Sequence, residues 1–515
     1  MELKLSNWAT GYVSDIDYPA GYYKELNVNH YLLPFLLSNL DNIPEGPHCE
    51  LGFGQGLSMN IHAAASSSTW YGTDFMPSQV AFALSLASAS GANLHLCDES
   101  FVDFCKRSDL PDFASISLHG IWSWISDENR AIIVDFIRRK LKVGGVLYIS
   151  YNTLPGWATF APMRHLMTEH ASVMGSLGKG VVSRVDGALE FAQKLMSTNP
   201  LFAKANPSVA DRFKKVSEQN RHYLAHEYFN KDWHPMHFAT MSEWLSPAKI
   251  SFACSAHYLD HINDANLTVE QQALLKDIPD TTFKESVRDF MVNQQFRRDF
   301  WIKGARKISA MEQVEKIKQQ RLVLTSTRED VSMKIAGALG LANLNEAIYL
   351  PVIDFMSDHK IRGIDEIAAY VKAKEVSFGE VIQVVIVLIG SGHLASVQTD
   401  EQINKAIATT SKLNKALIDK ARFSTETSFL ASPVTGGGIA VNRFQQLFLL
   451  AINEGKKQPQ EWAQFVWSLL ALQNQRLLID GIAIETTEGN LEELTRQAKE
   501  FAHNRMPILK ALHVL

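Results

Sequence analysis

Cysteine is scarce in this chain and occurs in none of the spacings that carry chemistry. The four cysteines form no C-x-x-C pair, so the sequence predicts neither a zinc site nor a disulfide framework. Long apolar runs are also missing: the longest, Val381–Ile389, is interrupted by Gln383 and predicts a buried helix rather than a membrane span. The N-terminal MELKLSNW contains no signal-peptide core. We therefore expect a cytoplasmic protein without metal ligands and without a membrane partner.

A broad basic surface is absent as well. The chain carries 50 Lys and Arg against 55 Asp and Glu, a formal net charge of −5, whereas nucleic-acid binding requires a basic face. The passage 266–310 has a local basic cluster between residues 297 and 307, and Glu285, Asp289 and Asp299 interleave this passage. This mixture favours an interdomain helix held by salt bridges. We expect no nucleic-acid partner.

The first 150 residues alternate between two periodicities. Short apolar runs predict five buried strands: His48–Leu51, Thr69–Thr73, Leu94–Cys97, Phe113–Leu118 and Val146–Ser150. Helical patterns separate these strands: Leu57–Ala65, Pro77–Ser90, Phe101–Lys106 and Asp127–Leu141. Such alternation indicates an α/β fold with a parallel, doubly wound sheet. Ligands bind such sheets at the carboxyl ends of the strands.

A bare glycine turn follows the first predicted strand, in HCELGFGQGLSMN. A P-loop would place Lys-Ser/Thr after its glycines, where this chain has Leu-Ser, and the nicotinamide fingerprint is G-x-G-x-x-G rather than G-x-G-x-G. Glu50 stands two residues ahead of Gly52. An acid at this place does not suit a phosphate cradle. The glycines alone are equally compatible with a purely structural turn.

Two further acids follow the next two strands. Asp74 lies about 20 residues beyond the glycines, where a carboxylate can accept hydrogen bonds from two ribose hydroxyls. Asp98 ends the third strand, and Phe75 and Phe101 beside these acids are placed to sandwich a purine. Each acid alone is explained by a loop or helix cap. Three acids at three consecutive strand ends favour a nucleoside-containing cofactor.

The pattern E-x-G-x-G-x-G resembles motif I of class I S-adenosylmethionine-dependent methyltransferases. DIDYPAGYYKELN, the stretch Ser117–Trp157 and HEYFNKDWHPMHF resemble the methyltransferases that carry a methyltransferase regulatory domain. FLASPVTGGGIAVNRFQQLFLLAI resembles the tail of that family more loosely. Its best-understood members are rickettsial-type protein-lysine methyltransferases that act on an outer-membrane protein. The resemblance implies S-adenosylmethionine as cofactor and a lysine of an outer-membrane or surface protein as acceptor.

The expected cofactor contacts come from the glycine turn and the strand ends. They are Glu50, Gly52, Phe53, Gly54, Gln55, Gly56, Asp74, Phe75, Asp98, Glu99, Phe101 and His119. Methyl transfer from a sulfonium is an in-line displacement that needs an aligned nucleophile, and a lysine acceptor must first lose a proton. Polar groups at the strand ends and in the N-terminal segment are expected to orient or desolvate the amine. The catalytic candidates are His119, Tyr151, Asn152, Tyr18 and Tyr12, with Tyr22 and Tyr23 beside them.

The alternation of predicted strands and helices stops after Trp157. We expect a class I (Rossmann-like) methyltransferase core over residues 1–265, with a helical, lid-like insertion at about 158–232 and one of the last strands at Lys249–Ala256. The insertion is alternatively an independent helical domain. Residues 266–310 are expected to form a connecting helical region of the regulatory domain, 311–400 a winged-helix-like domain and 401–515 a helical C-terminal domain.

Three functions fit these observations. The first is a protein methyltransferase acting on lysine, whose C-terminal half recruits the substrate. The second is a small-molecule methyltransferase with regulatory or dimerising C-terminal domains, which leaves room for a homo-oligomer. The third is a non-catalytic interaction protein, which the intact glycines and acids disfavour. The large C-terminal half is disproportionate for a small substrate and favours the first.

Overall fold

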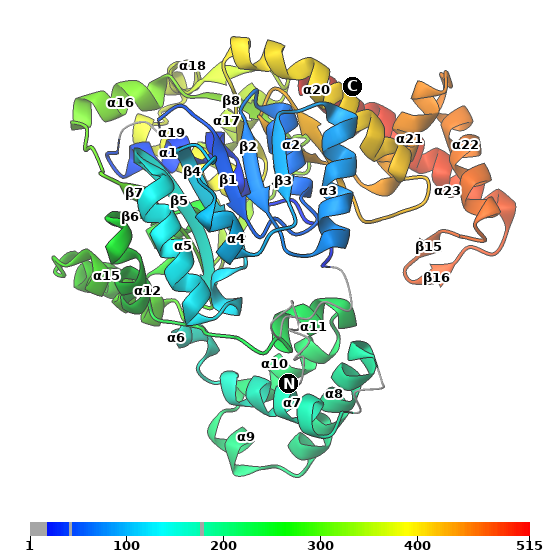
Figure 1. Ribbon diagram of the computed structural model, residues 1–515. Helices are drawn as coiled ribbons and strands as arrows, with labels where there is room; N and C mark the ends of the chain where they lie inside the picture. The colour runs from blue at the N-terminus through cyan, green and yellow to red at the C-terminus, as the bar shows by residue number, and fades with distance from the viewer. Residues whose placement is uncertain (1–17, 41–43, 176–179) are drawn as a thin grey trace.

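The computed structural model describes residues 18–40, 44–175 and 180–515 (Figure 1). Its centre is a seven-stranded sheet in the order β3-β2-β1-β4-β5-β7-β6. The strands are β1 His48–Leu51, β2 Trp70–Thr73, β3 Leu94–Cys97, β4 Phe113–Leu118, β5 Leu141–Asn152, β6 Ile250–Ser255 and β7 Phe296–Lys303. Strands β1 to β5 are parallel, and β7 runs antiparallel to β5 and β6. The five predicted strands and the later one near 249–256 are therefore confirmed, although β5 is longer at both ends.

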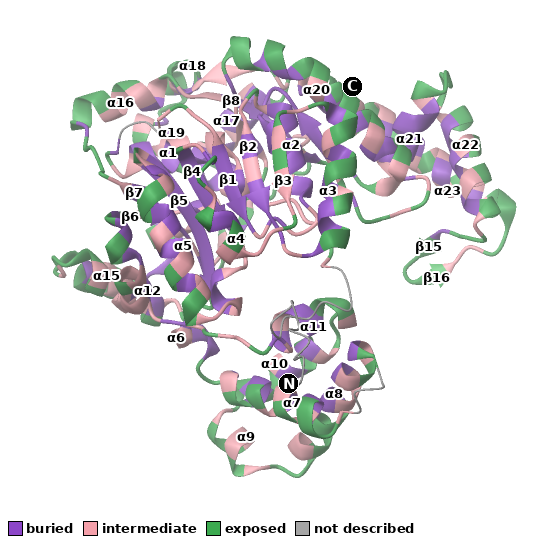
Figure 2. Ribbon diagram, in the orientation of Figure 1, coloured by how far each residue is buried: buried purple, intermediate pink, exposed green. Residues whose placement is uncertain are grey.

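Helices cover both faces of the sheet. The early ones are α1 Val28–Leu37, α2 Leu57–Ala65, α3 Pro77–Ser90, α4 Phe101–Lys106 and α5 Asp127–Lys140. Leu147 and Ile149 of β5 pack in one core with α4, α5 and α12 (Phe238–Leu245), whereas Val146 and Tyr148 point the other way, toward α1. This alternation makes the sheet the buried centre of the domain (Figure 2).

Strand β7 lies in the region predicted to be a connecting helical segment. That region contains α14 Val269–Lys276, α15 Thr281–Met291 and β7, and β7 lies between β5 and β6. The sheet is therefore completed only at Lys303, and a boundary at residue 265 divides it. The salt bridges predicted here do exist, but they are buried: Arg297 of β7 pairs with Asp289, Asp299 and Glu285. The charged pattern is thus divided between an interior strand, which carries Arg297 and Asp299, and α15, which carries Glu285 and Asp289.

The segment after β5 is a helical bundle with its own core. It comprises α6 Leu154–Trp157, α7 Ala161–Val173, α8 Val181–Ser197, α9 Leu201–Ala205, α10 Ser208–Ser217 and α11 Arg221–Tyr228. Buried residues such as Phe160, Val185 and Phe213 hold it together. Figure 1 shows the bundle beyond the end of the sheet where β5 leads into α6. The predicted insertion therefore lies at the carboxyl ends of the strands, and its role as a lid stays a prediction.

Residues 310–396 form a smaller unit with a three-stranded antiparallel sheet in the order β11-β8-β12. Its elements are α16 Ala310–Lys318, β8 Arg321–Leu324, β9 Lys334–Gly337, β10 Gly340–Asn343, α17 Glu346–Met356, β11 Arg362–Gly363, α18 Ile364–Val371, α19 Phe378–Gly390 and β12 Leu394–Ser396. The apolar run predicted as a buried helix is the core of α19. The winged-helix likeness stays a prediction. No helix among the described residues is long and apolar enough to cross a bilayer.

The C-terminal part is mostly helical and shares a core with the α/β part. Its elements are α20 Asp400–Lys420, β13 Phe429–Ser432, β14 Gly437–Ala440, α21 Arg443–Asn453, α22 Pro459–Leu472, β15 Leu478–Ile479, β16 Ile482–Ala483, α23 Thr487–Glu500 and α24 Met506–Ala511. Leu57 and Ile61 of α2 lie in one cluster with Leu413 and Leu417 of α20. Gly436 ends the turn between β13 and β14, and Gly437 and Gly438 are the first residues of β14. The C-terminal part is thus packed on the helix that follows the glycine turn.

Candidate active site

The glycine turn connects β1 to α2 in a backbone conformation that favours glycine. Gly52, Gly54 and Gly56 have φ angles of 73°, 57° and 66°, values that L side chains rarely adopt. A Cβ at Gly52 would lie 2.4 Å from Ile121 Cδ1, and one at Gly56 would lie 2.7 Å from Ala83 Cβ. At Gly54 the nearest atom is 3.5 Å away. Gly52 and Gly56 are therefore also required by packing, whereas Gly54 is required by its conformation alone.

The turn lines a cleft of about 1120 Å³ between the sheet and the helical bundle. Eleven of the twelve predicted cofactor residues line it: Glu50, Gly52, Phe53, Gly54, Gln55, Gly56, Asp74, Phe75, Glu99, Phe101 and His119. The other wall comes from the insertion and the segment after it, including Arg212, Lys215, Tyr223, Glu227 and Asp232. Residues of both the α/β part and the helical insertion therefore line the cleft.

Asp74 holds the glycine turn in place. Its Oδ2 accepts a hydrogen bond from the backbone N–H of Gly54 (2.8 Å), and its Oδ1 accepts one from Met76 (3.0 Å). Burial raises the pKa of Asp74 to about 6, against the effect of these two hydrogen bonds. A carboxylate has about four lone-pair sites, so acceptor capacity remains for ribose hydroxyls. The sequence predicted that Asp74 accepts hydrogen bonds from ribose hydroxyls. It did not predict the hydrogen bond that holds the glycine turn.

Glu50 presents an unsatisfied carboxylate oxygen in the same cleft. Its Oε2 is buried and has no hydrogen-bond partner within the described part of the chain. Burial, together with the charge of Asp74, raises the pKa of Glu50 to about 8. Buried polar atoms are normally paired. An orphaned carboxylate oxygen at this place fits a ligand that brings a cationic or hydrogen-bonding group.

At the third strand, the acid that faces the cleft is Glu99 and not Asp98. Asp98 is exposed and does not line the cleft. Glu99 lines it, and its buried Oε2 has no hydrogen-bond partner among the described residues, while Oε1 lies 3.4 Å from Arg107 Nη1. Phe75 and Phe101 both line the cleft, as their expected role beside a purine requires. Of these two acids, Glu99 is therefore the one placed to contact a ligand in the cleft.

His119, after β4, belongs to a stack of aromatic rings. Its ring lies 3.7 Å from that of Tyr23, nearly parallel to it, and its Nδ1 is joined by a 2.8 Å hydrogen bond to the Tyr148 hydroxyl. Burial lowers the pKa of His119 to about 4. The imidazole is therefore neutral near pH 7.

Tyr18 links the glycine turn to the helical bundle. Its backbone oxygen accepts a hydrogen bond from Gln55 Nε2 (3.0 Å), and its hydroxyl donates to Oε1 of Glu227 on α11 (3.1 Å). Burial raises the pKa of Glu227 to about 7, and the hydrogen bond from Tyr18 opposes this shift. Glu227 was not among the predicted residues. The signal for it was its place in HEYFNKDWHPMHF, one of the stretches that carried the family resemblance.

The structure brings only some of the other candidates to the cleft. Tyr151 is buried outside it and donates its hydroxyl to Asp299 Oδ2 (2.9 Å), within the ion-pair cluster of Arg297. Asn152 lines the cleft, but its Oδ1 already accepts a hydrogen bond from Trp157. Tyr22 packs against Phe429 and does not line the cleft. Tyr12 lies outside the described residues.

The histidines of the HEYFNKDWHPMHF stretch have separate surroundings. His226 is buried beside Tyr18, His234 lies 3.5 Å from Asp232, and the ring of His237 stacks on Phe290. Across the part of the chain that the structure describes, no three His, Cys, Asp or Glu side chains are grouped so as to hold a metal ion.

Comparison with known proteins places this arrangement in a family. A family model described as a predicted methyltransferase regulatory domain matches residues 220–303. Protein sll1526 of Synechocystis sp. is 36% identical over 512 residues, 98% of this chain and 99% of the relative. Protein RP789 of Rickettsia prowazekii is 25% identical over 362 residues, 66% of this chain and 60% of the relative.

A solved structure has the same fold. PKMT2 from Rickettsia typhi, in complex with AdoHcy, is 18% identical, with a TM-score of 0.69 over 96% of this chain and 100% of that chain. The strand order, with its antiparallel β7, the glycine turn and the cleft define a class I methyltransferase. The chain belongs to the class I methyltransferases that carry a methyltransferase regulatory domain.

Proposed function

We propose that the protein transfers the methyl group of S-adenosylmethionine to the side-chain amine of a lysine in a protein substrate. The observation that carries the lysine assignment is the pairing of Glu227 with Tyr18 in the cleft that also contains the glycine turn. An acid and tyrosines beside a methyl-donor site are suited to a cationic acceptor.

The residues present fit the cofactor. The bare backbone at Gly54 leaves room for close approach, and the orphaned Oε2 of Glu50 is suited to the amino group of the methionine part. Asp74 and Glu99 supply acceptors for the ribose and the adenine amino group. The bound cofactor supplies a methyl carbon already activated by its sulfonium, so this chain has to position and deprotonate the acceptor.

Glu227 performs the second task in this proposal. A lysine ammonium entering the cleft meets its carboxylate, with the tyrosine rings of Tyr18 and Tyr23 nearby to stabilise the positive charge. With its pKa raised to about 7, Glu227 takes one proton from the ammonium more readily than an exposed glutamate does. The neutral amine held beside Glu227 would then be the nucleophile for the methyl group that the bound cofactor would supply.

The size of the cleft supports an acceptor attached to a larger molecule. Pockets for drug-sized ligands have volumes of about 300–1,000 Å³, and this cleft exceeds that range. Part of its wall comes from Arg212, Lys215 and Tyr223 of the helical bundle, where a neighbouring peptide segment has polar contacts available. The structural relative is named PKMT2, an abbreviation of protein-lysine methyltransferase. By the family resemblance, the substrate is an outer-membrane or surface protein.

The proposal is tested by incubating the full-length protein with methyl-labelled S-adenosylmethionine and, separately, with protein and metabolite fractions of its host. Label is expected in protein, and Glu227→Gln is expected to lose most of it. Glu218→Gln is the matched control, because Glu218 lies in the same bundle, is exposed and does not line the cleft. Label confined to metabolites would replace the lysine assignment by the small-molecule alternative.

A further inference from the structure

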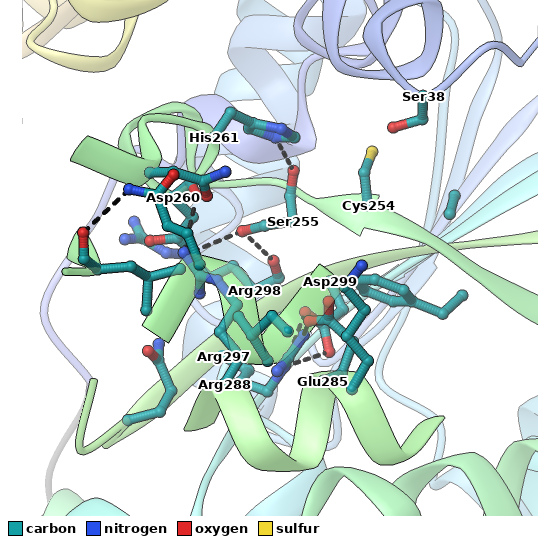
Figure 3. Close-up of a pocket in the computed structure, with 18 of the residues that line it drawn as sticks. Ser38, Cys254, Ser255, Asp260, His261, Glu285, Arg288, Arg297, Arg298 and Asp299 are labelled. Atoms are coloured by element: carbon teal, nitrogen blue, oxygen red, sulfur yellow. Dashed lines mark hydrogen bonds and ion pairs between the residues drawn. The ribbon is translucent and has the colours of Figure 1, made fainter. Parts of the chain in front are cut away.

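A second cavity, of about 650 Å³, lies between the edge of the sheet and the pair of helices α14 and α15 (Figure 3). The side chains of Cys254, Ser255 and His261 lie on one side of it, and those of Glu285, Arg297 and Asp299 on the other. All its lining residues except Ser38 fall within the stretch matched by the regulatory-domain model. It shares no lining residue with the methyl-transfer cleft. Its chemistry is therefore separate from that of the proposed reaction.

The acids that line this cavity are already paired. Both oxygens of Asp299 lie within hydrogen-bond distance of Arg297 Nε, and Glu285 Oε2 accepts from Arg297 Nη2 (2.8 Å). Asp260 Oδ2 accepts the hydroxyl proton of Ser255 (2.7 Å). Because these acids are held by internal partners, they contribute little free acceptor capacity to a ligand.

Three of the five cations of the cavity are not matched by an acid in this way. The side chains of Lys276 of α14 and Lys284 of α15 make no hydrogen bond or ion pair within residues 18–40, 44–175 and 180–515. Arg288, one turn after Lys284, makes a single side-chain hydrogen bond in the same ranges, from Nη2 to the backbone oxygen of Asp260 (2.7 Å). Five Lys and Arg side chains line the cavity against three Asp and Glu. Arg297 and Arg298 are held by acids, including Asp289 and Glu25 outside the lining, so the cations left for a ligand are those of Lys276, Lys284 and Arg288.

A phosphate group matches this lining. It carries a charge of about −1.5 to −2 at neutral pH and offers three strong acceptor oxygens, and Lys and Arg are the side chains that bind it most often. The volume falls within the range of about 300–1,000 Å³ typical of small-ligand sites, so space remains for an organic part. We propose that this cavity binds a small molecule that bears a phosphate group, through Lys276, Lys284 and Arg288.

Calorimetric titration of the full-length protein with inorganic phosphate and with pyrophosphate tests the proposal. Saturable binding is expected with a dissociation constant below about 1 mM for pyrophosphate. Lys284→Gln and Arg288→Gln should each weaken it about tenfold, since each removes a charge-assisted hydrogen bond. Lys415→Gln, an exposed lysine of α20 outside the cavity, should leave it unchanged.

The test remains decisive if one variant is poorly folded. Lys284 has no internal partner in the described residues, so Lys284→Gln should melt like the wild type and settles the question alone if Arg288→Gln does not fold. The absence of saturable heat with either anion overturns the proposal. An equal loss of affinity in Lys415→Gln also overturns it, because binding would then reflect overall charge.

Discussion

Replacing Asp74 by asparagine should weaken cofactor binding while leaving the fold intact. The carboxylate accepts one backbone N–H on each oxygen, whereas an amide keeps one acceptor and places a donor where the second stood. Loss of one hydrogen bond to a charged acceptor costs about 1.5–3 kcal/mol. The loss of one such bond, either to the ribose or to the glycine turn that shapes the site, corresponds to about a 10- to 150-fold rise in the dissociation constant of S-adenosylhomocysteine.

The thermal stability of Asp74→Asn should change little. Burial raises the pKa of Asp74 to about 6, so burying the ionised carboxylate costs free energy in the ligand-free protein. The neutral amide of asparagine avoids this cost, which offsets the loss of one backbone hydrogen bond. Calorimetry and a melting curve near neutral pH measure both quantities. Asp98→Asn is the control: an exposed residue outside the cleft should leave binding within about twofold. Wild-type binding by Asp74→Asn, or an equal loss in Asp98→Asn, would refute the reasoning.

Three further changes test neighbouring parts of the account. Because the pKa of Glu50 is raised to about 8, the binding of a cationic amino group should release the proton of the Glu50 carboxyl. The affinity for S-adenosylhomocysteine should therefore rise by up to about tenfold per pH unit from about pH 6 to 8. In calorimetry, Glu50→Gln should flatten this rise. In the ligand-free wild type, the same shift makes the free energy of unfolding fall as the pH rises from about 4.5 to 8, since the native state binds more protons than the unfolded state in this range. Glu99→Gln should weaken S-adenosylhomocysteine binding several-fold; no change in its dissociation constant would remove Glu99 from the site. Arg297→Ala leaves buried acids unpaired and should lower the free energy of unfolding in urea by about 3–5 kcal/mol, against less than about 1 kcal/mol for the exposed pair broken in Arg138→Ala; equal losses would contradict it.

The first five strands were predictable because each is a short apolar run bounded by turn residues or a helix start. Strand β7 was not, because buried charge interrupts its apolar pattern. Arg297 and Asp299 are interior only because they pair with each other and with acids of α15, a compensation that no local periodicity records.

In the candidate site, too, residues close together in the sequence were predicted, and contacts between distant residues were missed. The glycine turn and Asp74 lie close together in the sequence, and their spacing predicted a common edge of the sheet. Glu227 meets Tyr18 across 209 residues of chain. The distinction between Asp98 and Glu99 depends on which side chain turns into the cleft. Such contacts are set by tertiary packing.

The C-terminal half has a closer relation to the core than its separate domain pattern indicated. Leu413 and Leu417 of α20 share a buried cluster with Leu57 and Ile61 of α2. A fragment ending near residue 265 would lack β7 and expose this apolar face. The proposed recruitment of substrate by the C-terminal half is better tested by exposed substitutions on the intact chain, with methylation of folded protein compared with that of short peptides.

The central claim is that lysine is the acceptor, and identification of the methylated amino acid tests it most directly. The full-length protein is incubated with methyl-labelled S-adenosylmethionine and host protein, and the labelled protein is hydrolysed to amino acids and separated. The account predicts label in methylated lysine, strongly reduced in Glu227→Gln and retained in Glu218→Gln. Label in another amino acid, or equal labelling by Glu227→Gln and the wild type, would contradict it.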